Sequence, residues 1–297
     1  MILVLSFLLT FTDPPIDLST NMDEFGGTTT PDGKTMYFTI SVQRSYIYTI
    51  CYSEFRNGRW QPPQVAPFSG EYRDFDPVLS PDGNKMVFTS NRPVGNEIKS
   101  DYDIWMVTKD ESGRWSAPVH LDSAINSKYD EHFASIASSG NIYFSSNRPG
   151  ALGGEGDADF YLSKFVDGHY PSAEHLKEPS SPSYELDCTV SANETILLLG
   201  VYGGRGGLGN YDIYISEKIN GTWTPSKNLG TPVNSSFRDY SPRLTPDGKY
   251  MYFSSERDFS VTDGKVFSGY KDLKTKLTGT LNGASNIYMI EFSEVRK

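Results

Sequence analysis

The sequence predicts an all-β fold made of five repeats, each of four antiparallel strands. Three observations lead to this prediction: a recurring Pro-Asp-Gly turn, a carboxylate at a fixed distance before each turn, and an apolar strand after it. The turn is intact at Pro31-Asp32-Gly33, Pro81-Asp82-Gly83 and Pro246-Asp247-Gly248, and altered at 138–140 and 192–194. Proline presets the first central φ and glycine adopts a conformation that other residues resist, so each copy predicts a hairpin.

A carboxylate stands seven residues before every copy of the turn. These five column carboxylates are Glu24, Asp74, Glu131, Glu185 and Asp239. They follow one another at intervals of about 50 to 57 residues along nearly the whole chain. A unit that returns at such a period is the signature of a repeat array, in which each copy is one supersecondary element.

The rest of each repeat supplies the remaining strands. An apolar second strand such as Met86-Val87-Phe88 follows the turn, and a polar loop leads to a third strand such as 103–107. A glycine and an aromatic residue then precede a short fourth strand; the aromatic residues are Trp60, Trp115, Tyr170 and Trp223. Four antiparallel strands per repeat form a propeller blade, so the chain is predicted to be a single five-bladed β-propeller.

We expect one domain over residues 13–297, with repeats at about 20–69, 70–125, 126–180, 181–233 and 234–293. The fifth repeat lacks a fourth strand, and the segment 14–19 near the other end of the chain is expected to complete that blade. Removal of residues 1–19 should therefore open the last blade. The connection 258–285 is an insertion without strand periodicity. Loops of this length are uncommon, so we expect it to be mobile and dispensable for folding.

Composition limits the classes of function. The formal net charge of −10 disfavours nucleic acid, because phosphate contacts need clustered Lys and Arg. Cys51 and Cys188 lie in different repeats and predict buried thiols. The apolar run within residues 1–12 resembles the core of a secretory signal and is too short to span a bilayer. We expect an exported protein, periplasmic or extracellular, without a transmembrane span.

The run Ser80-Pro81-Asp82-Gly83 followed by Ser90-Asn91-Arg92-Pro93 resembles the WD-like (Pro-Asp-Gly) β-propeller repeat. That repeat occurs in TolB-like periplasmic proteins and in exported Bacteroidetes proteins. The segment 145–149 repeats its second half, and the Gly-rich loop 203–210 before Asp212 is similar to the exported group. The resemblance covers nearly the whole chain and implies the fold and export. TolB-like proteins carry six such blades beside another domain, whereas the repeats here number five.

The carboxylates define the candidate site. Because each enters an innermost strand, Glu24, Asp74, Glu131, Glu185 and Asp239 are expected to ring one mouth of the central channel as ligand-binding residues, with Arg92, Arg148 and Arg205 near its outer rim. His132 should point away from Glu131. The alternative is that each carboxylate caps backbone amides of the adjacent blade. Repelling carboxylates favour a cationic guest. The other histidines, His120, His169 and His175, make no metal spacing, so no metal site or cofactor is predicted, and a cation such as calcium is the alternative.

Three functions remain open. The first is a non-enzymatic scaffold presenting an acidic propeller face to a protein, peptide or envelope glycan. The second is a glycoside hydrolase or lyase that would use Asp76, Glu131 and Asp187 in the propeller funnel, since hydrolysis needs an acid and a base at a defined separation. The third is a structural element of an envelope assembly that binds through 258–285. Near-equivalent repeats favour the scaffold, because catalytic groups need different pKa values at distinct places.

Overall fold

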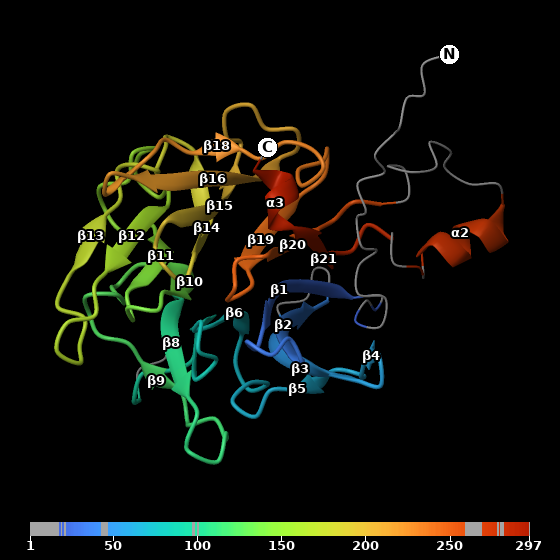
Figure 1. The fold of residues 1–297 in the computed structure, drawn as a ribbon, viewed down its shortest axis with the longest axis horizontal. Helices are drawn as coiled ribbons and strands as arrows, with labels where there is room; N and C mark the ends of the chain where they lie inside the picture. The colour runs from blue at the N-terminus through green and yellow to red at the C-terminus, as the bar shows by residue number, and fades with distance from the viewer. Residues whose placement is uncertain are drawn as a thin grey trace.

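The computed structural model describes residues 18, 20, 22–42, 47–96, 99, 101–258, 269–277, 279 and 282–296. Its strands form five separate antiparallel sheets around one axis, and two short helices are the only helices among these residues. The predicted all-β five-bladed propeller is therefore confirmed. Figure 1 shows the first strand of each sheet, β1, β6, β10, β14 and β19, near the middle, with the later strands towards the edge.

Each sheet uses consecutive strands of the chain, ordered from the axis outward. Blade 1 contains β1 (Asp23–Thr29), β2 (Thr35–Ser41), β3 (Tyr48–Arg56), β4 (Arg59–Trp60) and β5 (Gln64–Val65). Blade 2 contains β6 (Asp74–Leu79), β7 (Lys85–Ser90), β8 (Asp103–Thr108) and β9 (Val119–His120). Blade 3 contains β10 (Glu131–Ile136), β11 (Ile142–Ser146), β12 (Asp159–Ser163) and β13 (Ala173–His175).

Blade 4 contains β14 (Tyr184–Val190), β15 (Ile196–Tyr202), β16 (Tyr211–Ile219), β17 (Thr222–Trp223) and β18 (Lys227–Asn228). Blade 5 contains β19 (Asp239–Leu244), β20 (Tyr250–Ser255) and β21 (Asn286–Glu291). The helices are α2 (Tyr270–Leu277), which lies outside the ring of blades in Figure 1, and α3 (Phe292–Val295), which directly follows β21. No helix in the described ranges is long and apolar enough to cross a bilayer.

Blade 5 has three strands within the described part of the chain. Leu18 is 2% exposed and belongs to an apolar cluster with Met36, Phe38, Cys51 and Ile287, so it packs between blade 1 and blade 5. The rest of the predicted closing segment 14–19, the signal-like residues 1–12 and most of the insertion 258–285 lie outside the described residues. The strand closure, the repeat boundaries and the mobility of the insertion stay predictions.

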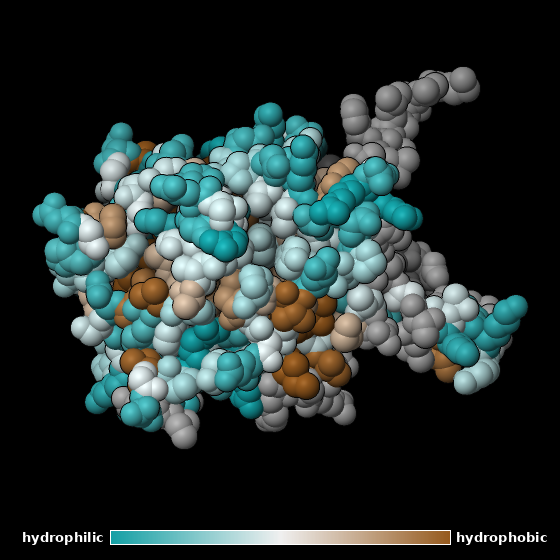
Figure 2. Space-filling model, turned by 90° about the horizontal axis from the view of Figure 1, so that it is seen from below, coloured by the Kyte–Doolittle hydropathy of each residue, from teal (hydrophilic) through white to brown (hydrophobic). Residues whose placement is uncertain are grey.

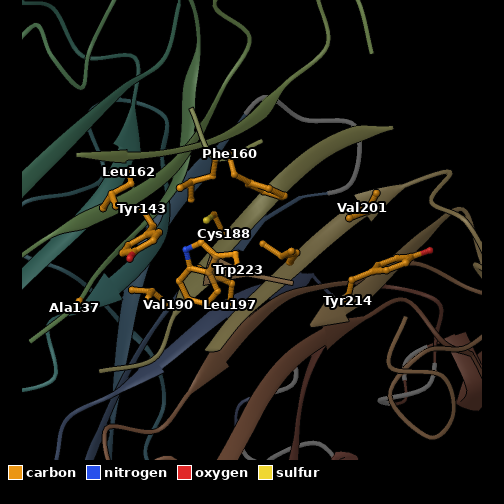
Figure 3. Packing of buried hydrophobic residues seen from close by; sticks show 12 residues of the cluster. Ala137, Tyr143, Phe160, Leu162, Cys188, Val190, Leu197, Val201, Tyr214 and Trp223 are labelled. Atoms are coloured by element: carbon orange, nitrogen blue, oxygen red, sulfur yellow. The ribbon is translucent and has the colours of Figure 1, made fainter. Parts of the chain in front are cut away.

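The apolar core lies between neighbouring blades. Figure 3 shows one such layer, in which Trp223 and Cys188 of blade 4 face Tyr143 and Phe160 of blade 3. Cys51 and Cys188 are both buried free thiols. The aromatic residues of the Gly-aromatic turns serve the same packing: Trp115 of blade 2 donates its indole N–H to the Tyr37 hydroxyl of blade 1 at 3.0 Å. The side of the molecule in Figure 2 is mostly hydrophilic, with small apolar patches.

Every innermost strand carries a bulge just after its column carboxylate. The pairing register shifts between Phe25 and Thr28 in blade 1 and between Phe75 and Val78 in blade 2, and likewise in the other three blades. Gly26 adopts positive φ at its bulge, and so does Asp76. A bulge bends the strand and re-aims its side chains. It therefore decides which residues of each innermost strand face the propeller axis.

Candidate functional site

The column carboxylates of blades 2, 3 and 5 are buried, and each is held by at least one serine hydroxyl and by an arginine. In blade 2, Asp74 accepts hydrogen bonds from Ser69 Oγ at 2.8 Å and Ser90 Oγ at 2.7 Å, and pairs with Arg92 at 2.5 Å. The Arg92 guanidinium also lies over the rings of Phe88 and Trp105, with centroids 5.0 and 5.3 Å away. Blades 3 and 5 repeat this clamp with Glu131–Arg148 at 3.1 Å and Asp239–Arg257 at 2.7 Å.

Blades 1 and 4 lack the arginine. Glu24 accepts hydrogen bonds from the backbone and hydroxyl of Thr20, and Glu185 accepts one from Ser181 N at 2.6 Å. No Lys or Arg of the described residues forms an ion pair with either carboxylate, and Glu185 Oε2 has no hydrogen-bond partner among them. Burial raises the pKa of Glu24 to about 7 and that of Glu185 to about 8, since water is removed without a compensating cation.

Four column carboxylates accept a hydrogen bond from the backbone N–H four residues earlier, which is a capping contact: Glu24, Glu131, Glu185 and Asp239. Arg92 and Arg148 lie at the column, but Arg205 is exposed in its loop and makes no ion pair within the described part of the chain. The third arginine of the column is Arg257, which was not among the residues selected from the sequence. The signal that finds it is Phe-x-Ser-x-Arg, which starts at residues 88, 144 and 253. Ligand binding by the column itself stays a prediction.

The candidate catalytic residues Asp76 and Asp187 meet at the axis. Arg243 pairs with Asp76 at 2.6 Å, and Ser241 Oγ donates to Asp76 at 3.2 Å and to Asp187 at 3.1 Å. Tyr211 donates its hydroxyl to Asp187 at 3.0 Å. All of these side chains are buried, and burial raises the pKa of both aspartates while Arg243 opposes the rise. The third candidate, at position 131, lies apart from this axial cluster, in its clamp with the blade 3 arginine.

Glycine makes room for the axial cluster. A Cβ at Gly26 would collide with a carboxylate oxygen of Asp76, and a Cβ at Gly200 would collide with one of Asp187. Gly26 also has φ +66, which other residues rarely adopt. The close approach of these two carboxylates to the backbone therefore depends on glycine at both positions.

One face of the propeller opens into a funnel with a cavity volume of about 860 Å³. Its lining residues come from all five blades: Asp23, Phe25, Ser41, Val42, Tyr48, Phe75, Tyr102, His132, Phe133, Leu186, Tyr211, Arg238, Tyr240 and Glu256. A volume in this range is typical of binding sites for small molecules or short segments. Tyr211 lines the funnel and donates its hydroxyl to Asp187, so this tyrosine lies between the funnel and the buried axial cluster.

Aromatic rings form a nearly continuous belt around the funnel. Successive ring centroids lie 5.3 to 6.2 Å apart along the series Tyr211, Tyr240, Phe25, Tyr48, Phe75, Tyr102 and His132. Every second pair of neighbouring planes is steeply inclined, by 77° for Tyr211–Tyr240 and by 81° for Phe25–Tyr48 and Phe75–Tyr102, and the pairs between them by 43° to 47°. Leu186 of blade 4 interrupts the belt. The funnel therefore offers a guest both ring faces and ring edges.

Three charged side chains complete the lining. Arg238 pairs with Glu256 at 2.8 Å and lies over the rings of Tyr211 and Tyr240, with centroids 5.6 and 5.0 Å away. Asp23 accepts a hydrogen bond from the backbone N–H of residue 285 at 2.9 Å. The lining thus holds two carboxylates and one guanidinium, and the guanidinium is engaged by its ion pair and two rings. Burial raises the pKa of Glu256, and Arg238 opposes the rise.

His132 points into the funnel while its neighbour Glu131 is buried, so the two side chains lie on opposite faces of the strand. Burial lowers the pKa of His132 to about 4, so the imidazole is neutral at neutral pH, and its Nδ1 has no hydrogen-bond partner among the described residues. Two other histidines are each hydrogen-bonded to the aspartate that begins the third strand of their blade. His120 lies 3.0 Å from Asp103, and His175 lies 2.7 Å from Asp159. Within the described ranges no three His, Cys, Asp or Glu side chains are arranged to hold a metal ion.

Of the five residues that directly follow a column carboxylate, the sequence predictions include only His132. The residue directly after each column carboxylate lines the funnel: Phe25, Phe75, His132, Leu186 and Tyr240. Four of these five side chains are aromatic rings, a regularity visible in the sequence. Further rings come from the beginning of a third strand or just before it: Tyr48, Tyr102 and Tyr211. Alternation along a strand predicts that a buried carboxylate is followed by a side chain on the opposite face.

The known proteins that resemble this chain share its fold. No family model matches the chain, and no curated protein matches it. A solved structure from Bacteroides ovatus, provisionally assigned as a glycoside hydrolase, aligns with a TM-score of 0.52 and 10% identity, covering 96% of each chain. A structure from Agrobacterium tumefaciens, provisionally assigned as TolB, aligns with a TM-score of 0.50 and 15% identity, covering 91% of this chain and 90% of that one. At these identities the chain is similar to both proteins in its propeller fold.

Proposed function

We propose that this chain is a non-enzymatic binding protein of the periplasm or cell surface, whose funnel holds part of a protein, peptide or envelope glycan. The observation that carries the proposal is the aromatic belt around a cavity of about 860 Å³. Aromatic side chains bury a large contact area, and concave sites lined by such rings with a few polar groups are the usual ligand sites of proteins. Export rests on the apolar run within residues 1–12.

The burial of the candidate catalytic residues supports binding over hydrolysis. A general acid or base must come within hydrogen-bond reach of the substrate. Asp76, Asp187 and Glu131 are buried and already bonded to arginine, serine or tyrosine side chains, so a ligand in the funnel does not meet them directly. The carboxylates that line the funnel are Asp23 and Glu256.

The test is capture of ligands from peptide and glycan arrays by the purified protein, followed by mass spectrometry of the recovered ligand. We expect capture that is lost in Tyr48→Leu, because Tyr48 contacts both Phe25 and Phe75 in the belt. The matched control is Tyr250→Leu, an exposed tyrosine outside the funnel. Recovery of a cleaved ligand would favour the hydrolase alternative. Equal capture by Tyr48→Leu and wild type would remove the funnel from the binding site.

A further inference from the structure

We propose that the funnel recognises an alkylammonium group, and that its occupant is a lysine-type side chain on a basic segment of a partner peptide or protein. The inference rests on the binding role proposed above and assigns the chemistry of the bound group. Two independent features of the funnel lead to it: the mutual inclination of its rings and the sign of its charge.

The inclined rings resemble a cage more than a platform. The ring pairs Tyr211–Tyr240, Phe25–Tyr48 and Phe75–Tyr102 are inclined by 77°, 81° and 81°, and the intervening pairs by 43° to 47°. A sugar ring stacks best on one flat aromatic face. A compact cation is attracted by the negative face of any ring within about 6 Å and is best held by several rings that face it from different directions. Because the rings of the belt are inclined to one another, their faces point in several directions, as the second arrangement requires.

The funnel already holds a cation in this way. Arg238 sits over Tyr211 and Tyr240 and pairs with Glu256, so these groups accommodate positive charge. Asp23 is a second carboxylate of the lining, so the lining carries a net negative charge with Arg238 in place. The chain as a whole has a formal net charge of −10. Both the site and the surrounding field therefore favour a positively charged guest.

The rings next to Asp23 give the guest a defined position. Phe25 contacts both Tyr48 and Tyr240, with centroids 6.2 and 5.9 Å away. Asp23 stands two residues before Phe25 on strand β1, and both residues line the funnel. Alternation along a strand puts residues two apart on the same face, which sets the Asp23 carboxylate beside the Phe25 ring. An ammonium group that lies in the funnel against Phe25 and its neighbouring rings therefore has a carboxylate within reach.

The test compares two capped tripeptides that differ in charge, acetyl-Ala-Lys-Ala-amide and acetyl-Ala-norleucine-Ala-amide, by calorimetric titration of the wild-type protein. We expect the lysine peptide to bind at least about 10-fold more tightly at low salt, a difference of about 1.4 kcal/mol. The difference should shrink as salt is raised, because the funnel carboxylates are partly exposed and are screened. Equal affinity of the two peptides, or no binding of either, would overturn the inference.

Variants locate the effect. Glu256→Gln and Tyr48→Leu should each reduce the preference for lysine over norleucine several-fold, whereas Tyr250→Leu, outside the funnel, should leave it unchanged. The preference is the ratio of the affinities of one variant for the two peptides. A loss of folded protein lowers the binding of both peptides equally and therefore does not change this ratio. If the wild type shows no preference but the arrays still show capture that depends on Tyr48, the ammonium chemistry is wrong and the binding role stands. Loss of that capture as well would remove the binding role itself.

Discussion

All five blades have a buried carboxylate at the same position of the innermost strand, but two groups of blades differ in how its charge is neutralised. Blades 2, 3 and 5 form the first group, and blades 1 and 4 form the second. In the first group the carboxylates pair with Arg92, Arg148 and Arg257. Each of these arginines lies two residues after the residue that pairs with the column carboxylate on the second strand. In the second group that position is occupied by Val42 in blade 1 and by Gly203 in blade 4. Equivalent backbone positions thus hold carboxylates in two electrostatic environments.

This contrast indicates that the electrostatic environment of the column carboxylates differs from blade to blade. A buried carboxylate beside a guanidinium keeps its charge at modest cost, because the ion pair and hydrogen bonds replace water. A buried carboxylate without a cation takes up a proton instead, which is why the pKa values of Glu24 and Glu185 rise to about 7 and about 8. Four substitutions test the contrast, in order of decreasing effect.

Arg92→Leu should destabilise the protein most. It leaves the Asp74 carboxylate buried without its cation and removes the contact of Arg92 with three aromatic rings, so we expect a loss of about 3–5 kcal/mol in the free energy of unfolding. Urea denaturation at neutral pH measures it. Arg205→Leu, in an exposed loop, is the matched control and should change little. A loss below about 1 kcal/mol for Arg92→Leu would show that the clamp is not needed for stability.

Glu185→Gln should have the opposite sign at high pH. The folded protein retains the Glu185 proton up to about pH 8, whereas the unfolded chain releases it near the ordinary pKa of 4.5. Stability from this group is therefore lost as pH rises through this range, and the glutamine variant should be the more stable by roughly 2–4 kcal/mol at about pH 9 and similar to wild type at about pH 4. Thermal melts across this range measure the difference. Glu111→Gln, on the surface, should follow the wild type; a parallel offset at all pH values would contradict the prediction.

Glu131→Gln should destabilise where Glu185→Gln stabilises. The substitution removes the charge that pairs with Arg148 and that accepts hydrogen bonds from Ser127 and Ser146. Hydrogen bonds to charged groups contribute about 1.5–3 kcal/mol, so a loss of that size is expected in urea denaturation at neutral pH. The two glutamine variants change the same atoms in equivalent positions. Effects of the same sign in alkaline solution would show that the arginine does not decide the behaviour of the column.

Val42→Arg should give blade 1 an arginine–carboxylate pair like those of blades 2, 3 and 5. An arginine at this position corresponds to Arg92 and should pair with Glu24, which lowers the pKa of that carboxyl from about 7. We expect a gain of at most about 1 kcal/mol in mildly alkaline solution and less in mildly acidic solution, because the new side chain is partly exposed. Thermal melts under the two conditions measure it. Val119→Arg, at an exposed position in blade 2, is the control; an equal gain there would assign the effect to net charge.

Much of the fold could be predicted because its signals are local. The Pro-Asp-Gly turns, the apolar second strands and the period of the column carboxylates specify hairpins and their number without knowledge of distant contacts. The candidate site was predicted less completely. The column carboxylates are buried, so their predicted binding of a ligand stays a prediction, and Arg257 takes the place in the column that the sequence did not indicate.

Turn chemistry and strand periodicity depend on residues that are near neighbours in the chain. The sequence by itself therefore determines the repeat, its strands and the alternation of their side chains. Which face of each innermost strand meets the axis depends on the assembled fold, since the bulges after Phe25, Phe75 and their equivalents re-aim the strands. The assembled fold also brings aromatic rings from different blades into one belt and sets the pKa values of Glu24 and Glu185. Both outcomes depend on how adjacent blades exclude water, and that exclusion exists only once the ring of blades has assembled.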